Sequence, residues 1–489
     1  MDKNKPNQNR MGTQPLLGLI MKMSLPAMFS MLIQSLYNVV DSIFVGMSSE
    51  SDKPLAAVSL AFPIQTLLIA FAIGTAIGTS SLVARRLGQD KAGEAGHVAA
   101  HGLLLSLFTS IVFAVLGLLF SRGFLELFEN DAEIIEMGTS YLRICCIFCF
   151  GIFMQVSIEK ILQGTGNMIW PMISQLVGAV TNLILDPILI FGFGGFPAMG
   201  VAGAAIATVA GQILAMIFCI VVLARKDHAI HISFRGFKCR RQIIKDIYAV
   251  GAPTIVMQSI GTLMTAGMNL ILSAYTVAAY TVFGLYFKLQ SFVFMPVFGL
   301  MQGLMPIMAF NYGAEKHNRV TTALRYGIYI ALLINTVGML LFLLAPMPLL
   351  SIFSVSQETL TLGIPALRVI SLCFMPAAVG ITIGTLFQAV GKGIYSMITS
   401  VMRQLVVLIP CAQLMSFLTG DVFYIWWAMP IADTVSLTVT LLLLKRLIRT
   451  QLGSVRGGFA LPRSETPSAE SSPAGSPTAS FDESKTVKL

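Results

Sequence analysis

Phe62-Pro63-Ile64-Gln65 and Phe287-Lys288-Leu289-Gln290 begin and end with the same residues and stand 225 positions apart. The same offset relates identical residues, in order, over a long stretch of the chain; these pairs include Gly74/Gly299, Gly78/Gly303, Ala84/Ala309, Gly88/Gly313, Lys91/Lys316, Arg143/Arg368, Gln163/Gln388 and Gly166/Gly391. Chance does not keep one register over so many positions. The chain therefore contains one structural unit twice.

The composition places both units in a membrane. Hydrophobic residues make up 55% of the 489 residues and charged residues only 11%, against roughly 25% charged residues in a typical soluble domain. Apolar stretches long enough to cross a hydrocarbon core of ~30 Å, each about 20 residues of helix, recur along the whole chain. We count twelve of them between residues 16 and 444. The sequence predicts an all-α integral membrane protein of twelve transmembrane helices.

The repeat divides these helices into two pseudo-symmetric lobes of six. We expect a cytoplasmic N-terminal segment over 1–15, an N-terminal lobe over 16–223, a basic cytoplasmic linker over 224–246, a C-terminal lobe over 247–446 and a disordered cytoplasmic tail over 447–489. Because six is even, both lobes start on the same face of the membrane. Parallel repeats of this kind are related by an axis along the membrane normal and enclose a central cavity.

The positive charges fix the orientation. Most of the 32 Lys and Arg residues fall on the side of the N-terminus, in the segments 85–91, 225–245 and 316–325, at Lys160 and Lys392, and after the last helix. Lys and Arg accumulate on the cytoplasmic side of membrane proteins. We therefore expect a multi-pass plasma-membrane protein with both termini in the cytoplasm. The net charge of +9 reflects this topology and not nucleic-acid binding.

Two helices of the N-terminal half carry a polar face. Gln34, Asn38 and Asp41 are spaced by four and three residues on the first helix, and Asn182 and Asp186 by four on the fifth. Both helices run outward, and each aspartate lies about five residues before the end of its helix, so the carboxylates are expected at similar depth. Charges within a bilayer are expensive, which makes them candidates for function.

The second half lacks this cluster, since Cys411 corresponds to Asp186 and Val407 to Asn182. Pro187, next to Asp186, removes a backbone donor and frees a carbonyl oxygen near the carboxylate. An uncharged side chain evidently suffices for packing at this position of the repeat. We therefore favour an ion or proton site in the N-terminal lobe over a structural role for the acid.

Several motifs together resemble the multidrug and toxic compound extrusion (MATE) family, and the bacterial branch in particular. They are Leu25-Pro26, the run Gln-Ser-Leu-Tyr-Asn-Val-Val-Asp over 34–41, Gly88, the turn Gln163-Gly164-Thr165-Gly166-Asn167, and the Asn182-to-Asp186 spacing with Pro187. The resemblance covers residues 16–446. It implies cation-coupled multidrug efflux by antiport.

The resemblance also implies which residues hold the coupling ion, H⁺ or Na⁺. They match Asp41, Asn182, Asp186 and Thr208, with Asn38 nearby, and no other cofactor is implied. Other branches of the family carry a carboxylate in the seventh helix. This chain has only apolar or neutral residues from Val250 to Ser273, which disfavours an ion site there.

Further polar residues in the predicted helices could bind substrate or gate its passage. They are Gln34, Gln65, Lys288, Gln290, Arg403 and Asp433. Lys288 takes the place of Pro63 in the repeat and is either a counter-charge or gate, or a buried cation satisfied by carbonyl oxygens. Arg403, at the place of Gly178, either neutralises Asp433 or faces a lipid headgroup.

The substrate class follows from the apolar composition. A cavity lined by Phe, by several of the 27 Met residues and by a few acids suits amphipathic cations, because aromatic faces attract cations and Met repacks readily. We expect a monomer that exports drug-like small molecules. The main alternative, a lipid-linked oligosaccharide flippase, would need a more cationic cavity. A channel does not need two repeats around one ion site, and the sequence shows no constellation typical of an enzyme.

Overall fold

The structure, a computed structural model, describes residues 10–46, 53–195, 197–225, 229–232, 237–353 and 356–452; the side chains of residues 37–43 and 45–46 and of Leu55 are outside the described part. Among the described residues, ten helices are long and apolar enough to cross a bilayer. Two bent helix pairs raise the number of spans to twelve when each pair counts as one. The predicted all-α membrane fold is confirmed.

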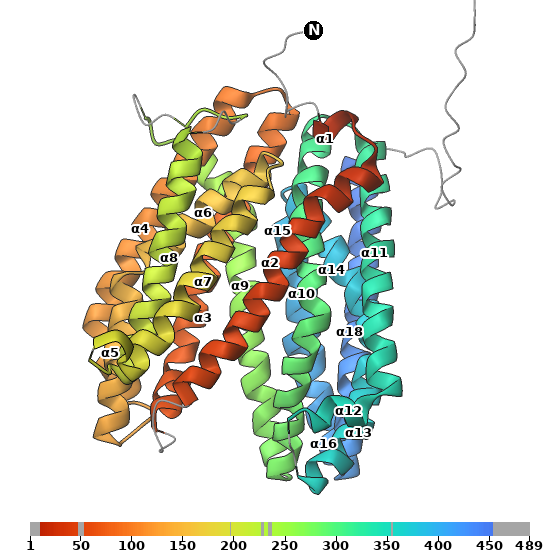
Figure 1. The fold of residues 1–489 in the computed structure, drawn as a ribbon. Coiled ribbons are helices and arrows are strands. Elements are labelled where there is room, and N and C mark those ends of the chain that lie inside the picture. Colours follow the sequence, from red (N-terminus) through yellow and green to blue (C-terminus); the bar gives the residue numbers. More distant parts are fainter. Residues whose placement is uncertain are drawn as a thin grey trace, which may run out of the picture.

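The N-terminal lobe contains the first six spans. They are α2 (Leu16–Gly46), α3 (Lys53–Gly88), α4 (Ala92–Leu125), the pair α5 (Ala132–Ile147) and α6 (Phe150–Gly164), α7 (Ile169–Phe191) and α8 (Gly200–Arg225). A short helix α1 (Arg10–Thr13) precedes them, and the 3₁₀ turn η1 (Phe193–Gly195) follows α7. In Figure 1 this lobe runs from red to yellow-green.

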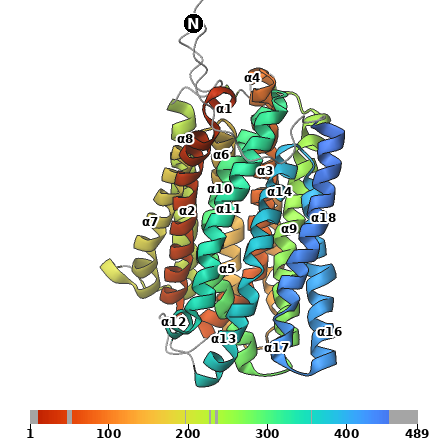
Figure 2. The same ribbon diagram turned by 90° about the vertical axis from the view of Figure 1, so that its right-hand side faces the viewer.

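The C-terminal lobe repeats this plan. Its spans are α9 (Arg241–Ser273), α10 (Val277–Gly313), α11 (His317–Leu344), the pair α13 (Gln357–Ser371) and α14 (Phe374–Ala389), the segment α15 (Gly393–Val401), η2 (Met402–Leu408) and α16 (Ile409–Thr419), and α18 (Ala428–Gln451). Two short helices, α12 (Pro346–Ser351) and α17 (Val422–Ile425), lie at the end opposite the N-terminus (Figure 2).

The bent pairs occupy corresponding places in the two lobes. The α5–α6 pair bends by 45° and the α13–α14 pair by 47°. At the first break the N–H of Cys149 donates to the carbonyl of Cys146 at 3.3 Å, and at the second the N–H of Cys373 donates to that of Ile370 at 3.0 Å. Such bonds to the third preceding residue tighten the turn and redirect the helix axis. The predicted repeat is thus visible in the helix geometry.

Glycines let the two lobes approach closely. Helix α3 packs on α9 and α10, and α2 packs on α10. A side chain at Gly78 would collide with the carbonyl oxygen of Ile247, and one at Gly88 with that of Phe310. These contacts join the end of α3 to the start of α9 and the end of α10, near the N-terminal end of the molecule.

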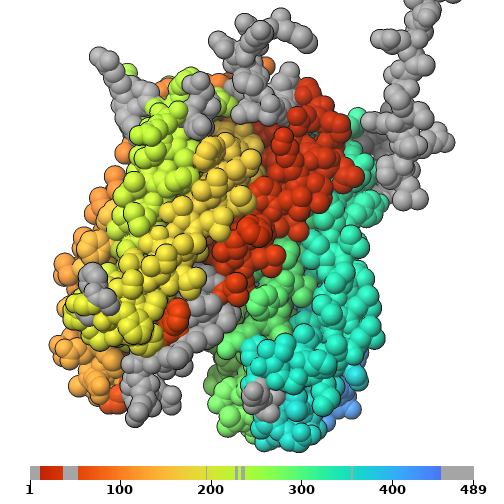
Figure 3. Space-filling view, viewed as in Figure 1, coloured from red at the N-terminus to blue at the C-terminus, as the bar shows by residue number. Residues whose placement is uncertain are grey.

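The hydrophobic core shows which end is closed. At the N-terminal end one buried cluster contains residues of both lobes, among them Leu87 of α3 and Leu304 of α10. At the opposite end the buried clusters are separate, one within the C-terminal lobe and two within the N-terminal lobe. The lobes are therefore joined at one end and apart at the other, where Figure 3 shows a cleft between them.

Three segment boundaries differ from the expected ones. Helix α18 continues to Gln451, so residues 447–451 are helical and not part of the tail, while 453–489 lie outside the described residues. Helix α9 begins at Arg241, within the expected linker, and α1 forms within the expected N-terminal segment. Composition marks where a helix enters the bilayer, and helices continue beyond that point for as long as backbone hydrogen bonding allows.

Candidate transport cavity and ion site

A cavity of about 580 Å³ lies between the lobes. Its size is within the range of pockets for drug-sized ligands, roughly 300–1,000 Å³. Helices α2, α3, α6 and α7 line it from the N-terminal lobe, and α9, α10, α14, α15, η2 and α18 from the C-terminal lobe. Phe298 and five methionines contribute to the wall; these are Met31, Met257, Met295, Met301 and Met305. The expected aromatic and methionine lining is present.

A polar contact joins the lobes across this cavity. Lys160 Nζ on α6 donates to Oε1 of Gln163 and to Oε1 of Gln302, both at 2.8 Å. Gln163 Nε2 donates to the same oxygen of Gln302 at 3.1 Å. Gln302 belongs to α10, so the two bonds that it accepts cross from one lobe to the other. Lys160, which we expected in a segment on the cytoplasmic side, lies within α6 and lines the cavity.

Glu159 is a second residue that sequence reasoning missed. Its side chain is 2% exposed. Oε1 accepts a hydrogen bond from Gln155 Nε2 at 3.1 Å, and Oε2 accepts one from Gln175 Nε2 at 3.2 Å. Within the described residues no Lys or Arg nitrogen forms an ion pair with it. The sequence feature that could have identified it is the adjacent pair Glu159-Lys160 in an apolar stretch. Because charged residues usually mark the end of a transmembrane helix, such a pair is easily assigned to a helix end.

A smaller cavity of about 150 Å³ lies inside the N-terminal lobe. Gln34, Glu159 and Gln175 line both this cavity and the central one. Asn182 and Thr208 form part of its wall. The Oε1 atom of Gln175 is buried and has no hydrogen-bond partner among the described residues. The two cavities therefore share one polar wall.

The structure brings together three of the predicted coupling residues. Asn182 and Asp186 are 2% and 1% exposed. With its amide oriented to satisfy both neighbours, Asn182 donates to Oδ2 of Asp186 at 2.7 Å and accepts from the Thr208 hydroxyl at 3.2 Å. The spacing of four residues places Asn182 and Asp186 on one face of α7, and the packing of α8 on α7 supplies Thr208.

Asn38 and Asp41 lie on α2, as expected, but their side chains are outside the described part of the chain. Helix α2 packs against α7, which carries Asp186. Ser35, one turn before these residues, lies 3.4 Å from Ser291 of α10, measured between the hydroxyl oxygens. The proximity of Asp41 to Asp186 stays a prediction.

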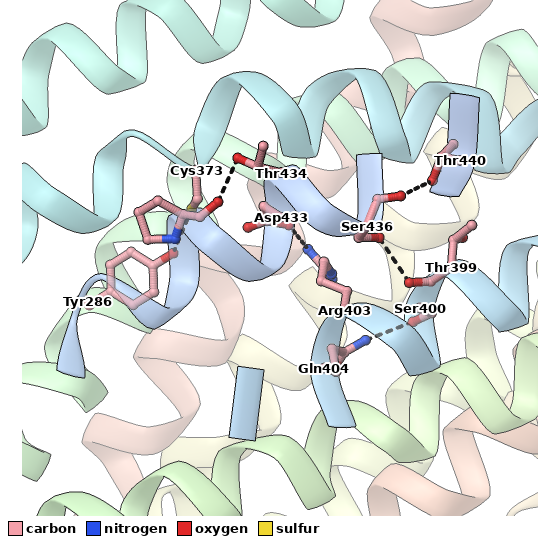
Figure 4. A network of polar contacts seen from close by, with 11 residues as sticks. Tyr286, Cys373, Thr399, Ser400, Arg403, Gln404, Asp433, Thr434, Ser436 and Thr440 are labelled. Atoms are coloured by element: carbon pink, nitrogen blue, oxygen red, sulfur yellow. Dashed lines mark hydrogen bonds and ion pairs between the residues drawn. The ribbon is translucent and has the colours of Figure 1, made fainter. Parts of the chain in front are cut away.

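The C-terminal lobe has its own charged pair, shown in Figure 4. Arg403 Nη1 donates to Oδ1 of Asp433 at 3.3 Å. Of the two alternatives for Arg403, the structure shows the ion pair. Arg403 and Gln404 lie in η2, a π-helical turn two residues before Pro410. Proline cannot donate a backbone bond to the preceding turn, and π-turns are frequent at functional sites.

The remaining candidates do not line either cavity. Gln65 Nε2 donates to the hydroxyl of Tyr141 at 2.9 Å, within the N-terminal lobe. The side chain of Lys288 is exposed, so the alternative of a buried cation is wrong for this residue. Gln290 is half-buried on α10. Gln34, Arg403 and Asp433 are the predicted substrate or gating residues that do line the central cavity.

Comparison with known proteins places these features in a family. A model of the MatE family matches residues 26–188 and 253–413, once in each lobe. The multidrug export protein MepA of Staphylococcus haemolyticus (strain JCSC1435) is 26% identical over 416 residues, which is 85% of this chain and 90% of that protein. The probable multidrug resistance protein YoeA of Bacillus subtilis (strain 168) is also 26% identical, over 84% of this chain and 90% of that protein.

Solved structures agree in fold. A multidrug resistance MATE family transporter of the MOP superfamily in an outward-facing conformation is 28% identical, with a TM-score of 0.86 over 92% of this chain and 99% of that one. A MOP superfamily transporter from Pyrococcus furiosus is 27% identical, with a TM-score of 0.86 over the same shares. Because the family model covers both lobes and more than half of the sequence, this chain belongs to the MatE family of multidrug and toxic compound extrusion transporters.

Proposed function

We propose that this protein is a secondary multidrug efflux antiporter of the cell membrane that exports amphipathic, mainly cationic, small molecules in exchange for H⁺ or Na⁺. The observation that carries the proposal is a drug-sized cavity between two lobes that shares a polar wall with a second cavity, which Asn182 and Thr208 also line. Relatives named as multidrug export proteins favour this function over the flippase alternative.

The joined and separated ends of the lobes support alternating access. With both termini in the cytoplasm, as the distribution of Lys and Arg indicates, the described conformation opens outward. Rocking of one lobe against the other would expose the same cavity to the cytoplasm. One chain contains a whole cavity, which supports transport by a monomer.

The coupling ion is proposed to bind in the N-terminal lobe at Asp41, Asn38, Asn182, Asp186 and Thr208. Two carboxylates in a low-dielectric site cannot easily both stay ionised and unpaired, so a shared proton or a bound Na⁺ relieves their repulsion. Carboxylate, amide and hydroxyl oxygens also suit a hard cation. The contacts among Asn182, Asp186 and Thr208 support this assignment.

Inverted membrane vesicles test the proposal. We expect vesicles that contain the protein to accumulate a cationic amphipathic dye when a proton or a sodium gradient is imposed, and one of the two gradients to suffice. Vesicles without the protein provide the baseline. Equal dye uptake in both preparations, together with flipping of a lipid-linked oligosaccharide, would replace the efflux proposal with the flippase.

A further inference from the structure

The central cavity is lined by as many cations as acids. Glu159 and Lys160 belong to the N-terminal lobe, and Arg403 and Asp433 to the C-terminal lobe. Glu159 and Asp433 are only 2% and 8% exposed. The side chain of Arg403, in contrast, is 34% exposed. The charge that an entering molecule can reach on the C-terminal wall is therefore positive.

Arg403 has hydrogen-bonding capacity to spare. A guanidinium group carries five N–H donors in a planar fork. In the described part of the chain one of them is engaged, at 3.3 Å, with a single oxygen of Asp433. Charge-assisted bonds of a well-matched Arg–carboxylate pair are shorter, about 2.7–2.9 Å, and are frequently bidentate. Asp433 thus holds the guanidinium in place without saturating it.

The rest of the pair's surroundings are polar but uncharged. Gln404 donates to the hydroxyl of Ser400 at 2.7 Å, and the Ser436 hydroxyl donates to the carbonyl of Thr399 at 3.0 Å. Figure 4 shows these groups beside Arg403 on the neighbouring turns of α15, η2 and α18. None of them competes as an anion for the guanidinium.

The fold itself does not require the pair. At the repeat offset, Arg403 stands where the N-terminal lobe has Gly178, and Asp433 stands where it has Thr208. The corresponding helices of the N-terminal lobe, α7 and α8, therefore pack together without an arginine at this position. A buried ion pair is also weak evidence for a stabilising role, because desolvation offsets much of the attraction between the charges.

We propose that Arg403 is the residue of the cavity that binds a carboxylate group of a transported molecule, and that it thereby distinguishes a compound with a free carboxylate from its ester. This inference rests on the proposed efflux function. The apolar body of such a molecule packs against Phe298 and the methionines, and its carboxylate meets the open side of the guanidinium. Asp433 acts as a positioning residue that also keeps the carboxylate from binding too tightly to be released.

A matched pair of compounds tests the site. The first is an aromatic amine that carries a carboxylate, and the second is its methyl ester, which is a plain cation of nearly the same shape. The variant is the double substitution Arg403→Gln and Asp433→Asn, which removes both charges together and leaves no unpaired buried acid. The control is Arg449→Gln, an exposed arginine in the last turn of α18.

We expect the wild type and the control to export both compounds. The double variant should export the ester within about twofold of the wild type and lose at least ~10-fold in export of the zwitterion, since a hydrogen bond to a charged group contributes about 1.5–3 kcal/mol. Loss of both compounds to the same extent, or no loss of either, would overturn the carboxylate site.

Binding to the purified protein separates the two proposals. If the wild type exports neither compound, the efflux function fails, and calorimetry with the same compounds still decides the role of Arg403. Zwitterion binding that is at least ~10-fold weaker in the double variant, with ester binding unchanged, supports the site. Equal zwitterion affinity in the wild type and the double variant contradicts it.

Discussion

Two buried acids of the N-terminal lobe, Asp186 and Glu159, differ in their hydrogen-bond partners. Asp186 receives a hydrogen bond from Asn182 on its own helix. Glu159 receives two, from Gln155 on its own helix and Gln175 on α7, and no cation pairs with it among the described residues. Hydrogen bonds from neutral amides compensate only part of the desolvation of a carboxylate. Glu159 is therefore suited to take up a proton or a cation.

Substitution of Asp186 tests the coupling site. Asp186→Asn keeps the shape and removes the titrating charge, so it should abolish gradient-driven export and leave membrane insertion intact. Asp41→Asn should act in the same way, and the double variant should be little worse than either single one, because residues that act as a unit are not additive. Vesicle export under an imposed gradient measures this. Full export by Asp186→Asn, with loss in Asp433→Asn, would move coupling to the C-terminal lobe.

Glu159→Gln tests the wall shared by the two cavities. The substitution keeps the side-chain length and removes the charge that attracts a cation into this wall. We predict at least ~10-fold slower export of a cationic dye, equivalent to about 1.4 kcal/mol, with normal amounts of protein in the membrane. Glu358→Gln, an exposed acid at the start of α13, is the matched control. Unchanged export in Glu159→Gln would mean that the acid serves packing alone.

At the scale of elements, close helix contacts hold the joined end together. The approach of α3 to α9 and α10 depends on glycines whose missing side chains leave room for a backbone carbonyl. Backbone atoms cannot rotate away from a new side chain as a flexible side chain can. These positions should therefore tolerate substitution less well than glycines with open space around them.

Gly78→Leu should push α3 away from α9, because its Cβ would collide with the carbonyl of Ile247. Overpacking of this kind destabilises by typically ~1–3 kcal/mol. We expect a lower melting temperature of the purified protein. Gly93→Leu in α4, where no atom lies within 4 Å of the added Cβ, is the control and should melt close to the wild type. Equal melting of both variants would show that the α3–α9 contact is not tight in solution.

On the scale of the whole molecule, the two lobes are held by a shared core and by several polar contacts, of which the bond from Lys160 to Gln302 lies beside the central cavity. The amine of Lys160 reaches across to Gln302 at 2.8 Å, next to the cavity that the lobes enclose. Opening the joined end must break this bond. The bond therefore favours the arrangement in which the lobes are joined at the N-terminal end of the molecule.

Gln302→Leu should shift this balance toward the state that is open at the N-terminal end of the molecule. It removes the acceptor shared by Lys160 and Gln163, and loss of a hydrogen bond to a charged donor costs about 1.5–3 kcal/mol, or at least ~10-fold in the population ratio. Spin labels at positions 133 and 358, on the separated ends of the two lobes, should report a shorter distance. Gln357→Leu, an exposed amide, serves as the control. An unaltered distance distribution in Gln302→Leu would show that this bond does not set the conformation.

The sequence by itself determined the architecture of this protein. Its apolar stretches set the spans, because a bilayer admits only helices whose backbone groups bond within the segment. The offset of 225 residues divided them into two lobes. Helical periodicity placed Asn182 and Asp186 on one face, and this local relation survives any packing of the helix. The composition predicted that methionines line the cavity, but not which methionines these are.

Only the tertiary structure decided where the other charges act. Lys160 lies only four residues before the end of α6, so by sequence it counts among the charges on the cytoplasmic side. The structure shows that its amine bonds across the cavity to the other lobe. The partners of Glu159 on α7 and of Arg403 on α18 come from helices that the sequence does not align with one another. Contacts of this kind depend on how helices rotate and cross, which side-chain packing over the whole molecule determines.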